Sequence, residues 1–216
     1  MFYDKELVGK YVTLRSAKAT EDDAKACIKL RSDKEKTKYM HAVDNTVEQQ
    51  IDWMKKQIEE PNDYLFLVEN KNNEIIGMMG VHGFQNDVAN AGRILMYGNA
   101  FESFEAYILL IEFGFNVLHL KRWWGDIAEN NVSATKFDKM FGWKFPEKIK
   151  SPLGKNVWYL DNLSEDEYYS KWLKKPEGCD FLEPYFELIE QMFFIIILEK
   201  DDFEKCAEKI KKMIYR

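Results

Sequence analysis

The feature that most constrains this fold is a strand, a helix and a second strand that follow one another between Arg93 and Glu129. The first strand is "RILMYG" and the second is "KRWWGDIAE". Between them a helix extends to about Leu118 and brings four apolar side chains near one face: Phe104, Ile108, Ile111 and Phe115. Because the helix joins the two strands as a crossover, this order predicts a β-α-β unit with a parallel strand pair.

The chain before this unit alternates strand and helix signals. Residues 11–17, "YVTLRSA", alternate apolar and polar side chains as a half-buried strand does. One helix is predicted from an N-cap at Thr20, and a second from Thr46, which forms a capping box with Gln49. Pro61 ends the second helix.

Two strands follow, "YLFLVEN" and "EIIGMMGVHGF", and the short polar turn "KNN" between them predicts an antiparallel hairpin. The next segment, "QNDVANAG" at residues 85–92, is predicted to be a turn before the strand at Arg93.

After the β-α-β unit a short helix is predicted over residues 131–142, with Gly142 at its end. A closing hairpin of "WKFPEKI" and "NVWYLDNL" and a helix from Ser164 to Lys175 complete the first domain. The predicted fold is α+β: a mixed, mostly antiparallel central sheet with helices on both faces and one β-α-β crossover.

The predicted boundary divides residues 1–175 from a C-terminal extension, residues 176–216, which we expect to serve packing or dimerisation. Its apolar run "MFFIIIL" at Met192–Leu198 is too short to span a bilayer. Periodicity leaves two structures open for the extension: two helices, or a strand followed by a helix.

Composition narrows the function classes. The 216 residues are 46% hydrophobic, which is enough for a full core, and a net charge of −6 argues against nucleic-acid binding through bulk electrostatics. Three cysteines without metal-ligand spacing predict neither a disulfide framework nor a metal site. The N-terminus has no apolar signal region, and we expect a cytoplasmic protein with no membrane partner.

Three local patterns, in this order, resemble the GCN5-related N-acetyltransferases (GNAT), particularly the branch that acts on protein N-termini and amino sugars. The first is "RSDKEKTKYM" followed by "EQQIDWM", which is similar to that branch's paired opening helices. The second is "EAYILLIEFGFNVLHLKRWWGDI", and the third is "NNVSATKFDKMFGWK". The resemblance covers about residues 10 to 174.

The resemblance implies transfer of an acetyl group from acetyl-CoA to a primary amine, by direct attack in a ternary complex. The acceptor would be an amino sugar, another small amine or a protein N-terminus. Two alternatives stay open: a catalytically degenerate binding or assembly module of the same fold, and an enzyme that uses another acyl thioester.

The resemblance also implies where acetyl-CoA binds. In such folds the fourth and fifth strands splay apart, the fourth strand holds the pantetheine arm, and the next helix N-terminus receives the diphosphate. The implied cofactor-binding residues are Leu95, Met96, Tyr97, Asn99, Ser103 and Asn131. For Asn131 a second role, the N-cap of the short helix, is equally open.

Two positions depart from the family pattern. The diphosphate turn, basic and glycine-rich in the family, contains Phe101 and Glu102 here, and a carboxylate repels a diphosphate. The family's proton-donating tyrosine in the short helix corresponds to Asp138.

Three residues are candidates for proton transfer: His82, Tyr97 and Glu102. A neutral amine that attacks a thioester loses a proton, and His82 titrates in a suitable range. Each candidate has a second interpretation, namely a satisfied or surface histidine, a strand aromatic and a first-turn acid. Tyr39 and His41, in the loop between the opening helices, are the predicted acceptor-binding residues, where an aromatic ring stacks on a sugar or flanks a peptide.

Overall fold

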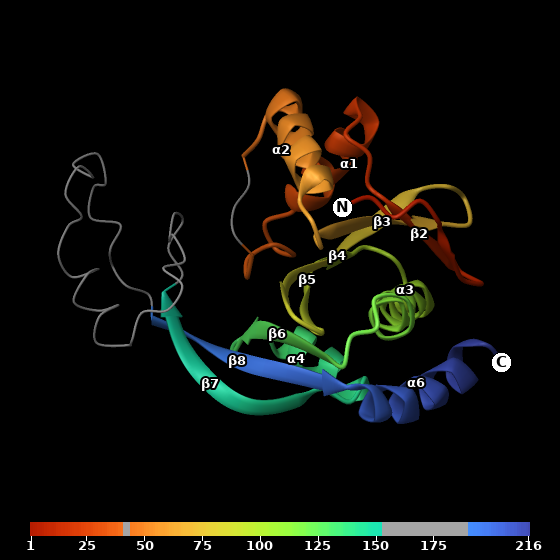
Figure 1. Cartoon of the computed structure of the whole chain (residues 1–216), viewed down its shortest axis with the longest axis vertical. Coiled ribbons are helices and arrows are strands. Elements are labelled where there is room, and N and C mark those ends of the chain that lie inside the picture. Colours follow the sequence, from red (N-terminus) through yellow and green to blue (C-terminus); the bar gives the residue numbers. More distant parts are fainter. Residues whose placement is uncertain (41–43, 153–189) are drawn as a thin grey trace.

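The computed structural model describes residues 1–40, 44–152 and 190–216. These residues form one mixed eight-stranded sheet with helices on both faces, which confirms the predicted α+β fold (Figure 1). The strands are β1 (Leu7–Val8), β2 (Val12–Ser16), β3 (Tyr64–Asn70), β4 (Ile75–Gln85), β5 (Val88–Met96), β6 (Arg122–Ala128), β7 (Lys144–Pro152) and β8 (Glu190–Glu199). The helices are α1 (Glu21–Arg31), α2 (Val47–Glu59), α3 (Ala100–Glu112), the π-helical turn η1 (Phe113–Val117), α4 (Val132–Met140) and α6 (Lys200–Ile214).

The spatial order of the strands is β1-β2-β3-β4-β5-β6-β8-β7. The pair β5 and β6 is parallel and is joined through α3, whereas the other neighbouring pairs are antiparallel. The predicted β-α-β crossover is therefore confirmed, and so is the hairpin of β3 and β4.

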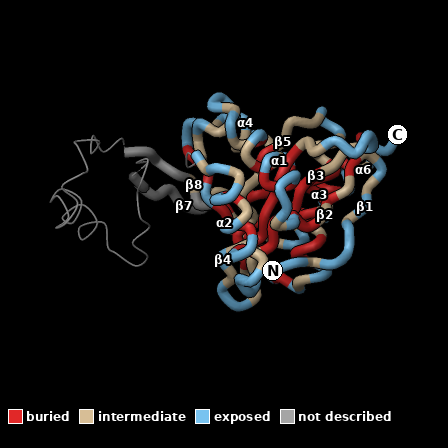
Figure 2. The backbone as a smooth tube through the Cα atoms, turned by 90° about the horizontal axis from the view of Figure 1, so that it is seen from above, coloured by how far each residue is buried: buried red, intermediate tan, exposed pale blue. Residues whose placement is uncertain are grey.

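The sheet separates two apolar clusters. Helices α1 and α2 cover one face through Ala24, Cys27 and Met54, while α3 and α6 cover the other with the larger cluster. Buried residues are concentrated along the central strands and α3 (Figure 2). Helices thus cover both faces of the central strands, so a ligand can reach these strands only at their ends and open edges.

The helices begin where the sequence predicts. The hydroxyl of Thr20 accepts from Asp23 N at the start of α1, and Thr46 and Gln49 complete a capping box at α2. The third helix ends earlier than expected: regular α-helix stops at Glu112, and η1 continues to Val117. Here a Cβ on Gly114 would lie 1.9 Å from the indole of Trp123, so only glycine lets η1 approach β6 this closely.

The predicted turn at residues 85–92 is wrong in its extent. The turn between β4 and β5 consists of Asn86 and Asp87, and Val88–Gly92 already belongs to β5. Asn86 has a φ of 58°, which asparagine tolerates in a tight turn. The small residues of this segment, Ala89, Ala91 and Gly92, suggested a loop but belong to strand β5.

The C-terminal run is a strand followed by a helix, the second of the two structures left open. Strand β8 pairs with β6 on one side and β7 on the other, so it lies within the sheet rather than in an appendage. Helix α6 then buries Phe203, Ala207 and Ile210 in the main core. Dimerisation through residues 176–216 stays a prediction.

Two further predicted elements, the strand "NVWYLDNL" and the helix from Ser164, lie outside the described residues. The partner that the structure does give to β7 is β8.

Candidate functional site

The pairing of the two parallel strands stops after three residue pairs. Val88, Ala89 and Asn90 of β5 face Arg122, Trp123 and Trp124 of β6, and no pair of these strands follows. Within the described chain, the edge of β5 from Ala91 to Met96 therefore has no neighbouring strand on the β6 side. We call this stretch the open edge, and the Asn90–Trp124 pair, where the strands part, the apex.

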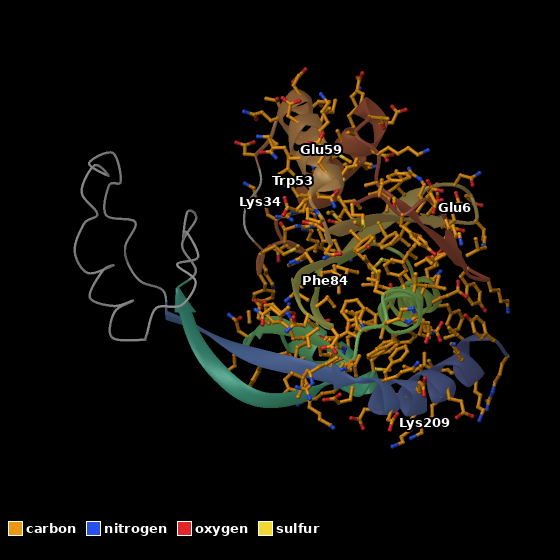
Figure 3. The ribbon with its side chains drawn as sticks, in the orientation of Figure 1. Glu6, Lys34, Trp53, Glu59, Phe84 and Lys209 are labelled. Atoms are coloured by element: carbon orange, nitrogen blue, oxygen red, sulfur yellow. The ribbon has the colours of Figure 1, made fainter. Side chains whose placement is uncertain are left out.

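A backbone irregularity lies just beyond the apex. Arg93 has a φ of 55°, an uncommon value for a residue with a side chain, and the register of β4 and β5 shifts between Met78 and Gly80. The guanidinium of Arg93 pairs with both carboxylate oxygens of Asp63, at 2.5 and 2.8 Å. It also lies 5.3 Å from the centre of the ring of Trp53, a residue of α2 (Figure 3).

A row of three residues crosses the sheet at the apex. His82 on β4 is paired with Asn90 on β5, which is paired with Trp124 on β6. The residues before them, Val81, Ala89 and Trp123, belong to the cluster under α3, so the row faces the α1 and α2 side.

Gly92 leaves room for two polar groups of this row. A Cβ on Gly92 would lie 2.5 Å from Nε2 of His82 and 2.7 Å from Oδ1 of Asn90. Both heteroatoms therefore point to the same place above the Gly92 backbone, where any larger residue would displace them.

His82 is neutral at physiological pH. Burial lowers its pKa to about 4, the nearby Arg93 guanidinium acts in the same direction, and Asp63 opposes it. The imidazole therefore keeps a lone pair at neutral pH.

The other end of the open edge is crossed by the loop between α1 and α2. Lys36 donates a hydrogen bond to the carbonyl oxygen of Met96 at 3.0 Å, and its ammonium lies 4.6 Å from the Tyr97 ring centre. Three residues later, Tyr39 donates to the carbonyl oxygen of Asn130 at 3.0 Å. The loop thus contacts β5 on one side and the segment between β6 and α4 on the other.

The N-terminus of α3 satisfies its own hydrogen bonds. Oδ1 of Asn99 accepts from the amides of Phe101 and Glu102, at 2.9 and 3.1 Å, and the Glu102 carboxylate accepts from Asn99 N at 2.8 Å. The Ser103 amide donates to the Asn99 carbonyl. A diphosphate at this turn would compete with a complete capping box.

The other candidates are engaged in structural contacts. The Tyr97 hydroxyl donates to the Leu30 carbonyl at 2.6 Å, and Asn131 accepts from Ala134 N as the N-cap of α4. His41 lies outside the described residues. The structure thus brings Tyr97, Glu102 and Ser103 together at the α3 end of the open edge.

His82 is remote from that group. Asn90 and Met96 are six positions apart on β5, a span of about 20 Å. His82 and Glu102 therefore cannot act on the same atom.

Asp138 faces the protein interior. It is 8% exposed and accepts a hydrogen bond from the Tyr107 hydroxyl at 2.8 Å, which joins α4 to α3. Burial raises the pKa of Asp138 to about 7, although the Tyr107 hydrogen bond acts in the opposite direction.

The sequence reasoning missed Asn90 and Lys36. Asn90 was assigned to a turn, and no sequence signal distinguished Lys36 from the neighbouring lysines of its loop. A polar residue flanked by Ala89 and Ala91, in a segment with strand residues on both sides, is the signal that could have identified Asn90.

Two general site types are not found in the described ranges. No His, Cys, Asp and Glu side chains gather there in a group of three or more that could hold a metal ion. Nor does any helix in those ranges have the length and apolarity to cross a membrane.

The comparison with protein families decides the class. The model of the acetyltransferase (GNAT) domain matches residues 12–144. The chain belongs to this family. It is an acyltransferase, and its open edge corresponds to the splayed strands that the resemblance implied. No curated protein sequence matches the chain.

Solved structures share the GNAT fold at low identity. A GCN5-related N-acetyltransferase from Brucella melitensis superposes with a TM-score of 0.70 and 14% identity, over 98% of this chain and 86% of the other. The apo form of FdhC, a nucleotide-linked sugar GNAT, has a TM-score of 0.64 and 14% identity, over 98% and 99%. Spermidine N-acetyltransferase from Vibrio cholerae, in complex with CoA and spermine, has a TM-score of 0.63 and 13% identity, over 91% and 99%.

Proposed function

We propose that this GNAT transfers an acetyl group from acetyl-CoA to a primary amine, by direct attack of the amine in a ternary complex. The observation that carries the proposal is the open edge of β5, which leads to an apex where a neutral histidine is placed. An extended acyl donor along this edge would bring its thioester toward His82.

The open edge fits the amide-bearing arm of acetyl-CoA. A strand edge without a neighbour offers backbone N–H and C=O groups to an extended ligand, and Met96 already uses its carbonyl for a donor, Lys36. The fit at α3 is different, because Asn99 and Glu102 occupy the groups that a diphosphate would contact. The residues that would hold the donor are therefore Ile94–Met96, with Lys36 as a cation bound at the Met96 end of that edge.

His82 would handle the proton of the reaction. Acetyl-CoA, when bound, supplies an acetyl thioester as the acyl donor. Nε2 of His82 accepts the proton that the amine nitrogen releases as the N–C bond forms and the C–S bond breaks. Because the pKa of His82 is about 4, the imidazole passes this proton on to water or to the departing thiolate, which leaves an amide and a free thiol.

The acceptor class is a primary amine: an amino sugar, another small amine or a protein N-terminus. One structural neighbour is a spermidine acetyltransferase and another is a nucleotide-linked sugar GNAT, so both small-amine classes occur on this fold. Tyr39 lies on the acceptor side in this proposal, on the loop that contacts Asn130.

Two measurements on the full chain test the proposal. Acetyl-CoA at 100 times its Kd stabilises a protein by about 2.7 kcal/mol, so titration to millimolar concentration should raise the melting temperature visibly. Thiol release is then followed with spermidine, glucosamine and a short peptide with a free N-terminus. No shift and no thiol release with any amine would refute the proposal.

The rival function, a non-catalytic binding or assembly module of the same fold, is not favoured by the match to an acetyltransferase domain. The same pair of measurements separates the two, since such a module would release no thiol.

A further inference from the structure

Asn90 is a largely buried residue at the apex, and no side-chain hydrogen bond holds its carboxamide within the described ranges. The residue is 4% exposed, but its polar atoms are not among the fully buried ones that lack a partner, so they reach solvent at the apex. Other buried polar side chains of this face are bonded: Gln50 accepts from Asn45 at 3.1 Å, and Gln57 donates to Asp63. The Asn90 carboxamide is therefore free of protein partners and open to a ligand that replaces water at the apex.

The surroundings of Asn90 determine what this ligand offers. Oδ1 of Asn90 and Nε2 of His82 converge above the Gly92 backbone, each within 2.7 Å of the position that a Cβ there would take. A neutral imidazole has one acceptor nitrogen and an amide oxygen is an acceptor, so the pair matches a group with two N–H donors.

Charge favours an uncharged donor group. The Arg93 guanidinium, two residues beyond Ala91 on β5, lowers the pKa of His82, and Asp63 neutralises it through two hydrogen bonds. The apex therefore has no free negative charge from these groups to hold an ammonium ion.

We propose that the Asn90 carboxamide, together with His82, binds the neutral primary amine of the acceptor. Asn90 Oδ1 accepts one N–H and His82 Nε2 accepts the other, which leaves the nitrogen lone pair to face the acyl carbon. This inference rests on the proposed acetyl transfer and assigns to it a residue for recognition of the amine. Asn90 is then a binding residue that also orients the nucleophile.

The test uses Asn90→Leu, which keeps the side-chain shape and removes both polar ends. Because the wild-type amide has no protein partner, the free variant should melt at the same temperature as the wild type or higher. The thermal shift with acetyl-CoA should be retained. With the amine that the wild type uses best, kcat/KM should fall by about fivefold or more, the value of one hydrogen bond, mainly through a higher KM.

Gln50→Met is the matched control. It also removes a buried amide, but one that has a partner, so this variant should lose stability and keep its amine KM.

The outcomes separate this inference from the function on which it rests. If the wild type acetylates no amine, the proposed function fails. If the wild type is active and Asn90→Leu melts at a lower temperature with an unchanged amine KM, Asn90 is structural and the inference is overturned. A loss of the acetyl-CoA shift in Asn90→Leu would also overturn it, because the carboxamide would then serve the acyl donor.

Discussion

The polar side chains at the two ends of the open edge differ in their hydrogen bonding. At the α3 end, Asn99 and Glu102 bond to each other's backbone amides and complete a capping box. At the apex, Asn90 is as buried as a core residue and has no side-chain partner in the described chain, and the neighbouring His82 is held neutral.

This difference indicates which end of the edge has polar groups available to a ligand. A completed cap stabilises α3 by about 1 kcal/mol and gains nothing from a ligand. The Asn90 carboxamide, which reaches solvent and has no protein partner in the described chain, can instead bond to a ligand that replaces water. In the proposed function, the apex is therefore the reactive end of the edge, and the α3 turn is primarily a helix end.

The largest expected effect concerns the pH dependence of stability at Asp138, a buried polar group that has a protein partner, Tyr107. Asp138 has a folded pKa of about 7 against 3.8 in the unfolded chain. The folded state binds the proton more tightly, so stability should fall by about 4 kcal/mol as pH rises from 4 to 7, and change little above 7. Asp138→Asn keeps an acceptor for Tyr107 and should remove this fall, as urea unfolding at each pH would reveal.

A flat wild-type profile would not contradict this prediction, because His82 opposes it. The contradicting result is an unchanged pH profile in Asp138→Asn, which would mean that Asp138 is solvated and ionised in the fold.

The next effect belongs to the apex. His82 has a folded pKa of about 4 and an ordinary value of 6.5, with Arg93 and Asp63 as the charged groups facing it. Its contribution to stability is present above pH 6.5 and is lost as pH falls toward 4, by about 3 kcal/mol. His82→Gln should therefore lose less stability on acidification than the wild type does.

The measurement is again urea unfolding from pH 4 to 8. The free energy of unfolding of the two single variants, His82→Gln and Asp138→Asn, should change with pH in opposite directions. Slopes of the same sign would show that one of the two environments has been assigned incorrectly.

The fold was predictable because its signals are local. The capping residues Thr20 and Thr46 begin helices where the sequence indicates, and the crossover from β5 through α3 to β6 follows from the order of apolar segments. The place of β8 was not predictable, since the pairing of Ile195–Leu198 with β6 depends on contacts across more than 60 residues of sequence.

The site was less predictable than the fold. His82 was identified by its chemistry, but its relation to Asn90 depends on register, and a mistaken turn at residues 85–92 hid that register. A shift of one residue in the strand register moves each side chain to the other face of the sheet. The α3 turn was located correctly, but its sequence could not show that Asn99 and Glu102 would bond to each other.

A smaller effect concerns the cap at the α3 end. Asn99→Ala removes the acceptor for the amides of Phe101 and Glu102 and should destabilise the protein by about 1 kcal/mol in urea unfolding. Ser103→Ala is the control. The Ser103 hydroxyl donates a long hydrogen bond of 3.4 Å to the Gly98 carbonyl, and losing this weak bond should cost less than about 0.5 kcal/mol. Equal losses of stability in the two variants would show that the Asn99 cap does not stabilise α3, and would weaken the contrast with the apex.

The smallest effect decides whether the α3 turn still influences the acyl donor. Glu102→Gln preserves the capping-box acceptor for Asn99 N but removes a negative charge from the helix N-terminus. If the diphosphate binds near this turn, the loss of repulsion should tighten the Kd of acetyl-CoA by about two- to fivefold, while stability falls by about 0.5 kcal/mol. Calorimetric titration measures the first and urea unfolding the second. Glu21→Gln, at the first turn of α1, should cost comparable stability and leave the Kd unchanged. A Kd that does not respond to Glu102→Gln would place the diphosphate away from α3, with side chains such as Lys36 as its remaining cationic partners at this end of the edge.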